Sequence, residues 1–81
     1  MPFEPFSDVV LTADILEEGL MAGDVGTVVE RHIAPGFEDG YSVEFFDMTG
    51  HTVAVLTVKQ TLLRSPTRTD RPAVRAMASR A

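Results

Sequence analysis

The sequence predicts an all-β fold, a small barrel of about five antiparallel strands followed by a flexible or short-helical C-terminal tail. Short runs rich in β-branched and aromatic residues recur over residues 8–64, with glycine and proline between them. One pair of these runs is separated by only a tight turn. The chain has 81 residues, which is room for one domain, and closing so small a sheet would remove its exposed edges.

The first third of the chain is expected to form one strand and one long loop. Residues 1–7 contain two prolines, which restrict the backbone and remove N–H donors, so they form an extended lead-in. Residues 8–13 are rich in valine and form the first strand. Residues 14–24 contain glycines, lack a clear cap and are too short for a convincing helix, so we expect a loop with Leu16 or Leu20 turned inward.

Residues 25–32 and 41–46 form the second and third predicted strands. Gly26 inside a strand indicates a bulge or a close approach of another backbone. The turn at residues 47–50 begins with aspartate and ends with glycine, which is the preference of a type I turn. It joins the third strand to a fourth over residues 51–58, so these two strands form an antiparallel hairpin.

The domain is expected to end with a helical turn at residues 59–61 and a short strand at residues 62–64. Beyond it, proline, arginine and small polar residues dominate and bury too little to order themselves. A short helix starting at Pro72 would need a partner to be stable. The barrel is therefore assigned to residues 8–64 and the arginine-rich tail to residues 65–81.

The alternation of side chains along each strand predicts the core. Tyr41, Val43 and Phe45 share one face of the third strand. Phe6 is expected to cover one end of the core. The candidate core consists of Val9, Leu11, Leu20, Val25, Val28, Val43, Phe45, Val53, Val55 and Leu62.

Charge is divided unevenly between the predicted domain and its tail. Residues 1–63 hold eleven acids and two bases, a net charge of −9, whereas residues 64–81 hold five arginines and one aspartate, a net charge of +4. An acidic body repels phosphate backbones, so it is unsuited to nucleic acid. The tail is either a contact for RNA, DNA or an acidic protein, or a solvated extension that folds back on the acidic body.

Several segments resemble a known family. They are Asp8-Val9-Val10-Leu11-Thr12, Glu17-Glu18-Gly19-Leu20, Gly23-Asp24-Val25-Gly26-Thr27-Val28-Val29-Glu30 and Val43-Glu44-Phe45-Phe46-Asp47 with Gly50. Together they resemble the bacterial domain-of-unknown-function family 4926 over residues 6 to about 64. The third segment is also similar to the Gly-x-x-Gly-x-Val step of SH3-like barrels and KOW domains.

The resemblance implies an SH3-like β-barrel and supplies no catalytic residue. Members of this kind occur as small stand-alone genes, sometimes beside a toxin-like partner, which implies an antitoxin-like role. The arginine-rich tail lies outside the resemblance.

The residues themselves give no sign of catalysis, a cofactor or a metal site. The chain has no cysteine, no serine in an elbow motif and no local pair of histidine ligands. The glycines at 23 and 26 lack the lysine and the helix that a phosphate loop requires. No apolar run approaches the ~18 residues of a membrane span, and no basic start of a signal peptide is present. We therefore expect a non-enzymatic cytoplasmic protein that does not enter membranes.

Partner binding is expected at the acidic loop, at outward aromatic residues and at the tail. In SH3-like barrels this loop forms one wall of the binding groove, and aromatics with an acidic rim suit a basic or amphipathic protein. The alternative is that the loop acids only keep the domain soluble and that Phe46 caps the open end of the barrel. The candidate partner-binding residues are Asp14, Glu17, Glu18, Asp24, Phe37, Phe46, Arg68, Arg71 and Arg75.

Three functions are compatible with these features. The first is a protein-interaction module, for example an antitoxin-type inhibitor, whose tail orders on a partner. The second is a KOW-like nucleic-acid- or ribosome-associated factor that uses the tail. The third is a small accessory subunit of an enzyme complex. The sequence favours the first and leaves the oligomeric state open.

Overall fold

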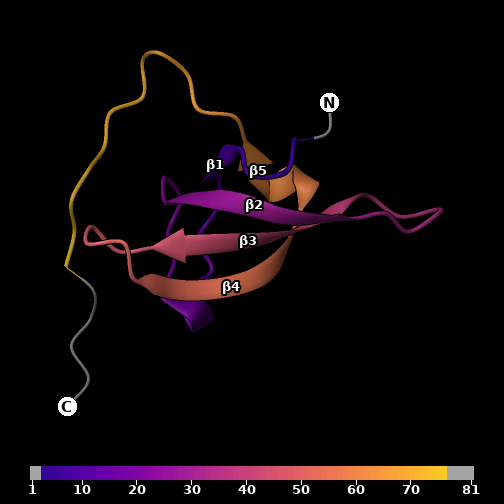
Figure 1. The fold of residues 1–81 in the computed structure, drawn as a ribbon, viewed down its shortest axis with the longest axis horizontal. Coiled ribbons are helices and arrows are strands. Elements are labelled where there is room, and N and C mark those ends of the chain that lie inside the picture. The colour runs from indigo at the N-terminus through magenta and orange to yellow at the C-terminus, as the bar shows by residue number, and fades with distance from the viewer. Residues whose placement is uncertain (1–2, 77–81) are drawn as a thin grey trace.

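The computed structural model of the protein describes residues 3–76 and contains one five-stranded antiparallel sheet (Figure 1). The strands are β1 (Asp8–Leu11), β2 (Val25–His32), β3 (Gly40–Phe46), β4 (Thr52–Lys59) and β5 (Leu63–Arg64). Two short 3-10 helices, η1 (Leu16–Glu18) and η2 (Gln60–Leu62), interrupt them. The sheet curls into a half-barrel, which confirms the predicted all-β, SH3-like architecture.

The strand order is β4-β3-β2-β1-β5, so β4 and β5 are the two edges of the sheet. The chain passes from one edge to the other through η2, and no ladder joins β4 to β5 within residues 3–76. Closure of the barrel is therefore incomplete at this seam. At this seam β5 has only two residues, and both pair with β1.

The core lies on the concave side of the curled sheet. Six of the predicted core residues are buried, namely Val9, Leu11, Leu20, Val28, Val43 and Phe45. Four further residues complete the buried set, namely Val10, Tyr41, Val58 and Leu63. The prediction was wrong for Val25, Val53 and Val55, which are exposed, and Leu62 is only partly buried.

The face of β4 is the main correction to the predicted core. Val43 of β3 lies opposite Leu56, and Tyr41 lies opposite Val58. Residues directly opposite each other in an antiparallel pair share a face, so Leu56 and Val58 join the core and Val55 is turned to the outside. Both faces of this strand carry aliphatic residues, so its own alternation did not distinguish them.

The aromatic residue that closes one end of the core is Phe3, not Phe6 as predicted. Phe6 adopts a positive φ of 65° and its side chain is 78% exposed. The Phe3 ring packs edge-on against Tyr41 with 5.3 Å between ring centroids. The Phe3 amide also donates a hydrogen bond to the buried Tyr41 hydroxyl at 3.0 Å, which satisfies that group.

The tail leaves β5 and forms an arch over residues 65–76 before returning to the body (Figure 1). An ion pair between Arg64 and Asp70 holds its start, and a second between Arg75 and Asp24 holds its end. Residues 72–76 are not helical, so the helix expected from Pro72 is not formed there, and its remainder falls outside the described residues. No helix within residues 3–76 is long and apolar enough to cross a membrane.

Candidate protein-binding groove

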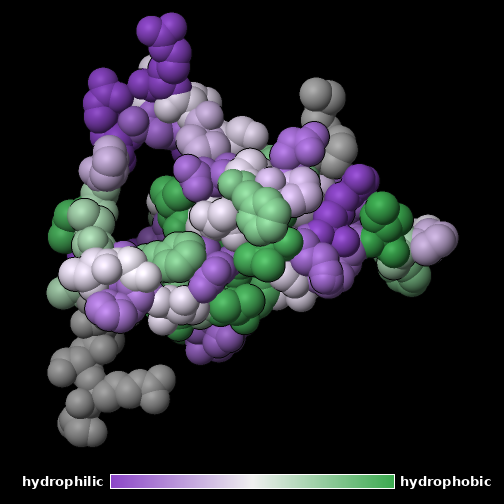
Figure 2. All heavy atoms as spheres, viewed as in Figure 1, coloured by the Kyte–Doolittle hydropathy of each residue, from purple (hydrophilic) through white to green (hydrophobic). Residues whose placement is uncertain are grey.

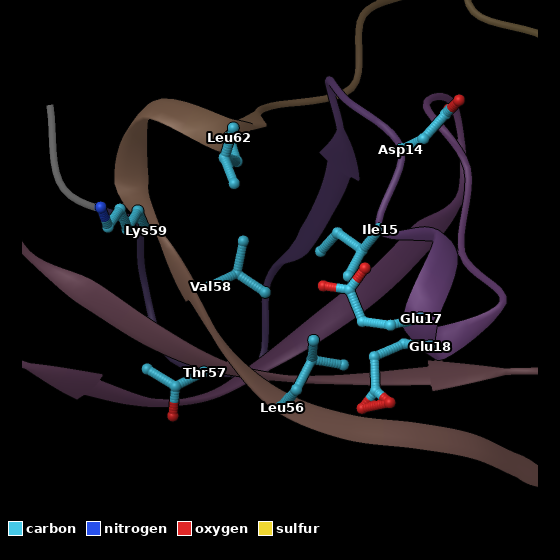
Figure 3. A pocket seen from close by; sticks show the side chains of 9 residues that line it. All are labelled: Asp14, Ile15, Glu17, Glu18, Leu56, Thr57, Val58, Lys59 and Leu62. Atoms are coloured by element: carbon cyan, nitrogen blue, oxygen red, sulfur yellow. The ribbon is translucent and has the colours of Figure 1, made fainter.

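A groove of about 610 Å³ runs along the open seam of the half-barrel (Figure 3). One wall is the 14–24 loop and the other is the second half of β4, with η2 at the end of the groove. We call it the seam groove. It is lined by Asp14, Ile15, Glu17, Glu18, Leu56, Thr57, Val58, Lys59 and Leu62.

The loop wall is shaped by local hydrogen bonds. Ile15 and Leu20 form an isolated antiparallel bridge, with amide-to-carbonyl distances of 2.9 and 3.1 Å. Between them, η1 ends at Gly19, which has a φ of 71° in the left-handed region and donates to the Leu16 carbonyl. Leu20 is buried and anchors the loop in the core. The predicted choice between two inward leucines is thereby decided, since Leu16 is 72% exposed.

Two of the four predicted loop acids hold the loop together. Asp14 Oδ1 accepts a hydrogen bond from the Ala22 amide at 2.8 Å. Asp24 Oδ2 accepts one from the Met21 amide at 3.0 Å. Short aspartate side chains that bond nearby amides favour such turns over helix. Asp14 and Asp24 are therefore engaged within the protein.

The other two acids, Glu17 and Glu18, face the seam groove. Both are exposed, and neither carboxylate accepts a hydrogen bond from any residue in the range 3–76. Figure 3 shows the Glu17 side chain turned from the loop towards β4, with Glu18 beside it near Leu56. Two adjacent carboxylates without an internal partner give this wall a strongly negative field.

The floor of the seam groove is apolar. Ile15, Leu56 and Leu62 are partly buried and pack against the core, and Val58 beneath them is buried. The only basic side chain that lines the groove within the described residues is Lys59, at the opposite end from the glutamates (Figure 3). A positively charged group on an aliphatic stem matches this combination of floor and rim.

A second hollow, of about 890 Å³, lies between the arch and the body, and Figure 2 shows the opening there. Asp24, Phe46, Arg71 and Arg75 line it together with other residues. Arg75 donates to both carboxylate oxygens of Asp24, one of them at 2.8 Å, and to the Gly19 carbonyl at 3.1 Å. Burial alone would raise the pKa of Asp24, but the Arg75 guanidinium and the Met21 amide bring that pKa below its ordinary value.

The remaining predicted residues lie apart from both hollows. Phe37 is 79% exposed in the connection between β2 and β3 and lines neither of them. Arg68 is exposed on the arch. The nine predicted residues are thus spread over the seam groove, the arch hollow and two isolated positions, because sequence proximity and chemical type do not determine which side of a barrel a residue occupies.

The apolar floor of the groove escaped the sequence-based prediction. Ile15 lies in a segment without clear periodicity, so its sequence context does not predict that it faces the core. Leu56 lies on the face of β4 that was predicted to point outward. The signal that could have found Leu56 is its two-residue spacing from Ala54 and Val58, which places these three apolar residues on one face of the strand.

The two histidines are engaged with hydroxyl groups. His32 Nε2 lies 2.7 Å from Ser42 Oγ, and His51 Nδ1 lies 2.7 Å from Thr49 Oγ1. No cluster of three or more potential metal ligands occurs in the part of the chain that the structure describes.

The fold and the groove define the class of this protein as a small SH3-like β-barrel with an acidic loop beside an open seam. The family described as "domain of unknown function (DUF4926)" matches residues 6–65, and the chain belongs to that family. No curated protein and no solved structure matches the chain.

Proposed function

We propose that this protein is a non-enzymatic interaction module of the bacterial cytoplasm that binds a basic segment of a partner protein in its seam groove. One observation carries the proposal. The Glu17 and Glu18 side chains project over an apolar floor, and their carboxylates accept no hydrogen bond from residues 3–76. Holding like charges side by side is unfavourable, and a cationic ligand would relieve that repulsion.

The chemistry of the groove selects the partner. Lysine or arginine can lay its aliphatic stem on Ile15 and Leu56 while its charged end reaches the glutamates. The net charge of −9 over residues 1–63 would steer such a partner to the surface and repel acidic ones. Charge would therefore govern the association rate and specificity, and the apolar floor would supply much of the affinity.

An inhibitor of a toxin-like partner is one concrete form of this function, and an accessory subunit of an enzyme complex is another. Both need the same protein-binding surface. A KOW-like contact with nucleic acid is the alternative, and it would use the tail. The internal pairing of Arg64 with Asp70 and of Arg75 with Asp24 leaves less of the tail charge for phosphates, which favours a protein partner.

The test is affinity capture from bacterial lysate with the full chain and with the double variant Glu17→Gln/Glu18→Gln, with and without nuclease. We expect a nuclease-resistant protein that is retained by the parent chain and lost by the double variant. Glutamine keeps the size of each side chain, and both positions are exposed, so folding is unaffected.

The matched control is Glu4→Gln/Glu30→Gln, which removes the same charge at exposed positions outside the groove and should retain the partner. The proposal is overturned if both double variants lose the partner equally. It is also overturned if capture depends on nucleic acid and is lost in Arg68→Gln/Arg71→Gln instead, because that result assigns binding to the tail.

A further inference from the structure

β4 is an edge strand with a long unpaired side. It runs for eight residues, Thr52–Lys59, and pairs only with β3 in the described chain. In an antiparallel pair, alternate residues direct their N–H and C=O groups away from the neighbouring strand. The outer side of β4 therefore presents a row of backbone donors and acceptors that can pair with another chain.

This edge carries few of the features that normally prevent strand addition. The strand contains no proline and only one charged residue, Lys59 at its end. A register shift at Phe45/Phe46 affects only the start of β4. The opposite edge of the sheet, β5, has only two residues and offers no comparable row.

The seam groove runs along this edge. Four consecutive residues of β4, from Leu56 to Lys59, line it. Consecutive side chains of a strand point to opposite faces, so a surface lined by all four follows the backbone edge and not one face. Figure 3 shows β4 passing beside the loop that carries Glu17 and Glu18. The unpaired backbone and the acidic wall thus border the same space.

We propose that an extended segment of a partner protein, with alternating basic and apolar residues, pairs with β4 as a sixth strand and closes the seam. The proposal rests on the proposed function and specifies how the partner is held. The apolar side chains of the added strand would cover Ile15, Leu56 and Leu62, and its basic side chains would reach the glutamates.

Other occupants fit this space less well. A second copy of the chain would bring another acidic body, with a net charge of −9 over residues 1–63, against the acidic wall. The arginine-rich tail of this protein contains Pro66 and Pro72, each of which lacks an N–H for the ladder. A basic strand from a different protein avoids both obstacles.

The test uses the full chain labelled with ¹⁵N and an acetylated, amidated seven-residue peptide of alternating lysine and valine. Two modified peptides carry N-methyl groups on alternate residues, one on the odd set and one on the even set. Only one set of N–H groups can face β4, so one modified peptide should lose about tenfold or more in affinity and the other should bind nearly as the parent does. Amides of β4 should gain protection from hydrogen exchange in the bound state.

The two proposals fail in different ways. Three results would show that the proposed function is wrong at this groove. The parent peptide does not bind, it binds Glu17→Gln/Glu18→Gln with the same affinity as the parent chain, or a valine–glutamate peptide binds the parent chain with equal affinity. If binding needs the glutamates but both N-methylated peptides bind equally and β4 amides gain no protection, the groove binds basic segments without strand addition. Dimerisation of the free chain with protection of β4 would assign the edge to a second copy.

Discussion

Gly26 of β2 packs so tightly against β3 that a side chain has no room there. A Cβ atom there would lie 2.5 Å from Val43 Cγ1 and 3.0 Å from the Glu44 carbonyl oxygen. Val43 is fully buried, so it has no free space to move into. The close approach expected from the sequence is thereby confirmed at Gly26, whereas the irregular pairing of β2 lies between Val28 and Glu30.

Replacing Gly26 with alanine or valine should destabilise the fold by about 1–3 kcal/mol or more, because the added atoms overpack the sheet. Chemical denaturation followed by circular dichroism measures this change. Gly40→Ala is the matched control, since its Cβ would lie 3.3 Å from the exposed Thr57 side chain and 3.9 Å from the Val58 carbonyl oxygen, and the substitution should be tolerated. Equal stability of the Gly26 variants and the parent would contradict the observed packing.

The two phenylalanines of the lead-in should differ in their importance. Phe3→Ala removes a ring that packs on buried Tyr41 and should cost about 1.5–3 kcal/mol of unfolding free energy. Phe6→Ala removes a ring that is 78% exposed and should cost less than about 0.5 kcal/mol. Thermal melts of the two variants provide the comparison, and a larger loss for the Phe6 variant would be inconsistent with the structure.

At the scale of elements, the arch depends on two exposed arginine–aspartate pairs. Arg64 donates two hydrogen bonds to Asp70, at 2.8 and 2.9 Å, and the Thr67 amide donates another at 2.6 Å. The Arg64 side chain and then the Thr67 amide hold the pKa of Asp70 well below its usual range. At the other end of the arch, Arg75 pairs with Asp24, so the described part of the tail folds back on the acidic body.

Acid should release the arch. The pKa values of Asp24 and Asp70 are lowered when the arch is held against the body by its two ion pairs. The stabilisation of the arch by these pairs is therefore complete above the ordinary aspartate pKa of about 3.8. It is lost as the pH falls through the lowered pKa values. NMR titration should show Asp24 protonating below its ordinary pH range. In Arg75→Gln that pKa should rise, whereas Arg71→Gln should leave it unchanged, because within residues 3–76 Arg71 donates only to the Arg68 and Asp70 backbone carbonyls.

An unchanged Asp24 titration in Arg75→Gln would show that Arg75 is not seated on this carboxylate in solution. An equal rise in Arg71→Gln would instead point to a general effect of tail charge.

The strands illustrate what an element's own sequence can reveal. In β3, Tyr41, Val43 and Phe45 alternate with the polar Ser42 and Glu44, and the predicted faces are confirmed. In β4, valines on one side alternate with Ala54, Leu56 and Val58 on the other, and the prediction chose the wrong side. A strand with apolar residues on both sides needs its neighbour to determine its face.

At the scale of the whole molecule, the core is built without residues 65–76. No residue from 65 to 76 is buried, whereas Phe3 of the lead-in and Leu63 of the last strand both contact the core. Because a chain of this size buries only about 60% of its unfolded surface, each of these contacts matters for stability.

A chain that ends at Arg64 should therefore fold with little loss of stability. The truncation removes four arginines and one aspartate and shifts the net charge from −5 to −8, which slightly increases self-repulsion. Urea denaturation of the full and truncated chains measures the difference, and repeating it at high salt isolates the effect of charge. A large loss of stability that persists at high salt would show that the arch contributes to the core.

The candidate site shows the limit of prediction from the sequence. Its charge was evident, since Asp14, Glu17, Glu18 and Asp24 are close neighbours along one loop. The division between acids that bond within the loop and acids that face the groove was not evident. Asp14 and Asp24 accept hydrogen bonds from loop amides only in the folded conformation of the loop. The β4 edge that faces the glutamates comes from about forty residues further along the chain, so only the curl of the sheet brings the two together.

The sequence by itself determined the number and approximate positions of the strands, the turn between β3 and β4, the tight packing at Gly26 and the division of charge. These properties depend on local preferences and composition, which act over a few residues. The tertiary structure alone decided the inward face of β4, the open seam and the docking of Arg75 on Asp24. Those features depend on register and on contacts between distant segments, whose energies exist only after the chain has folded.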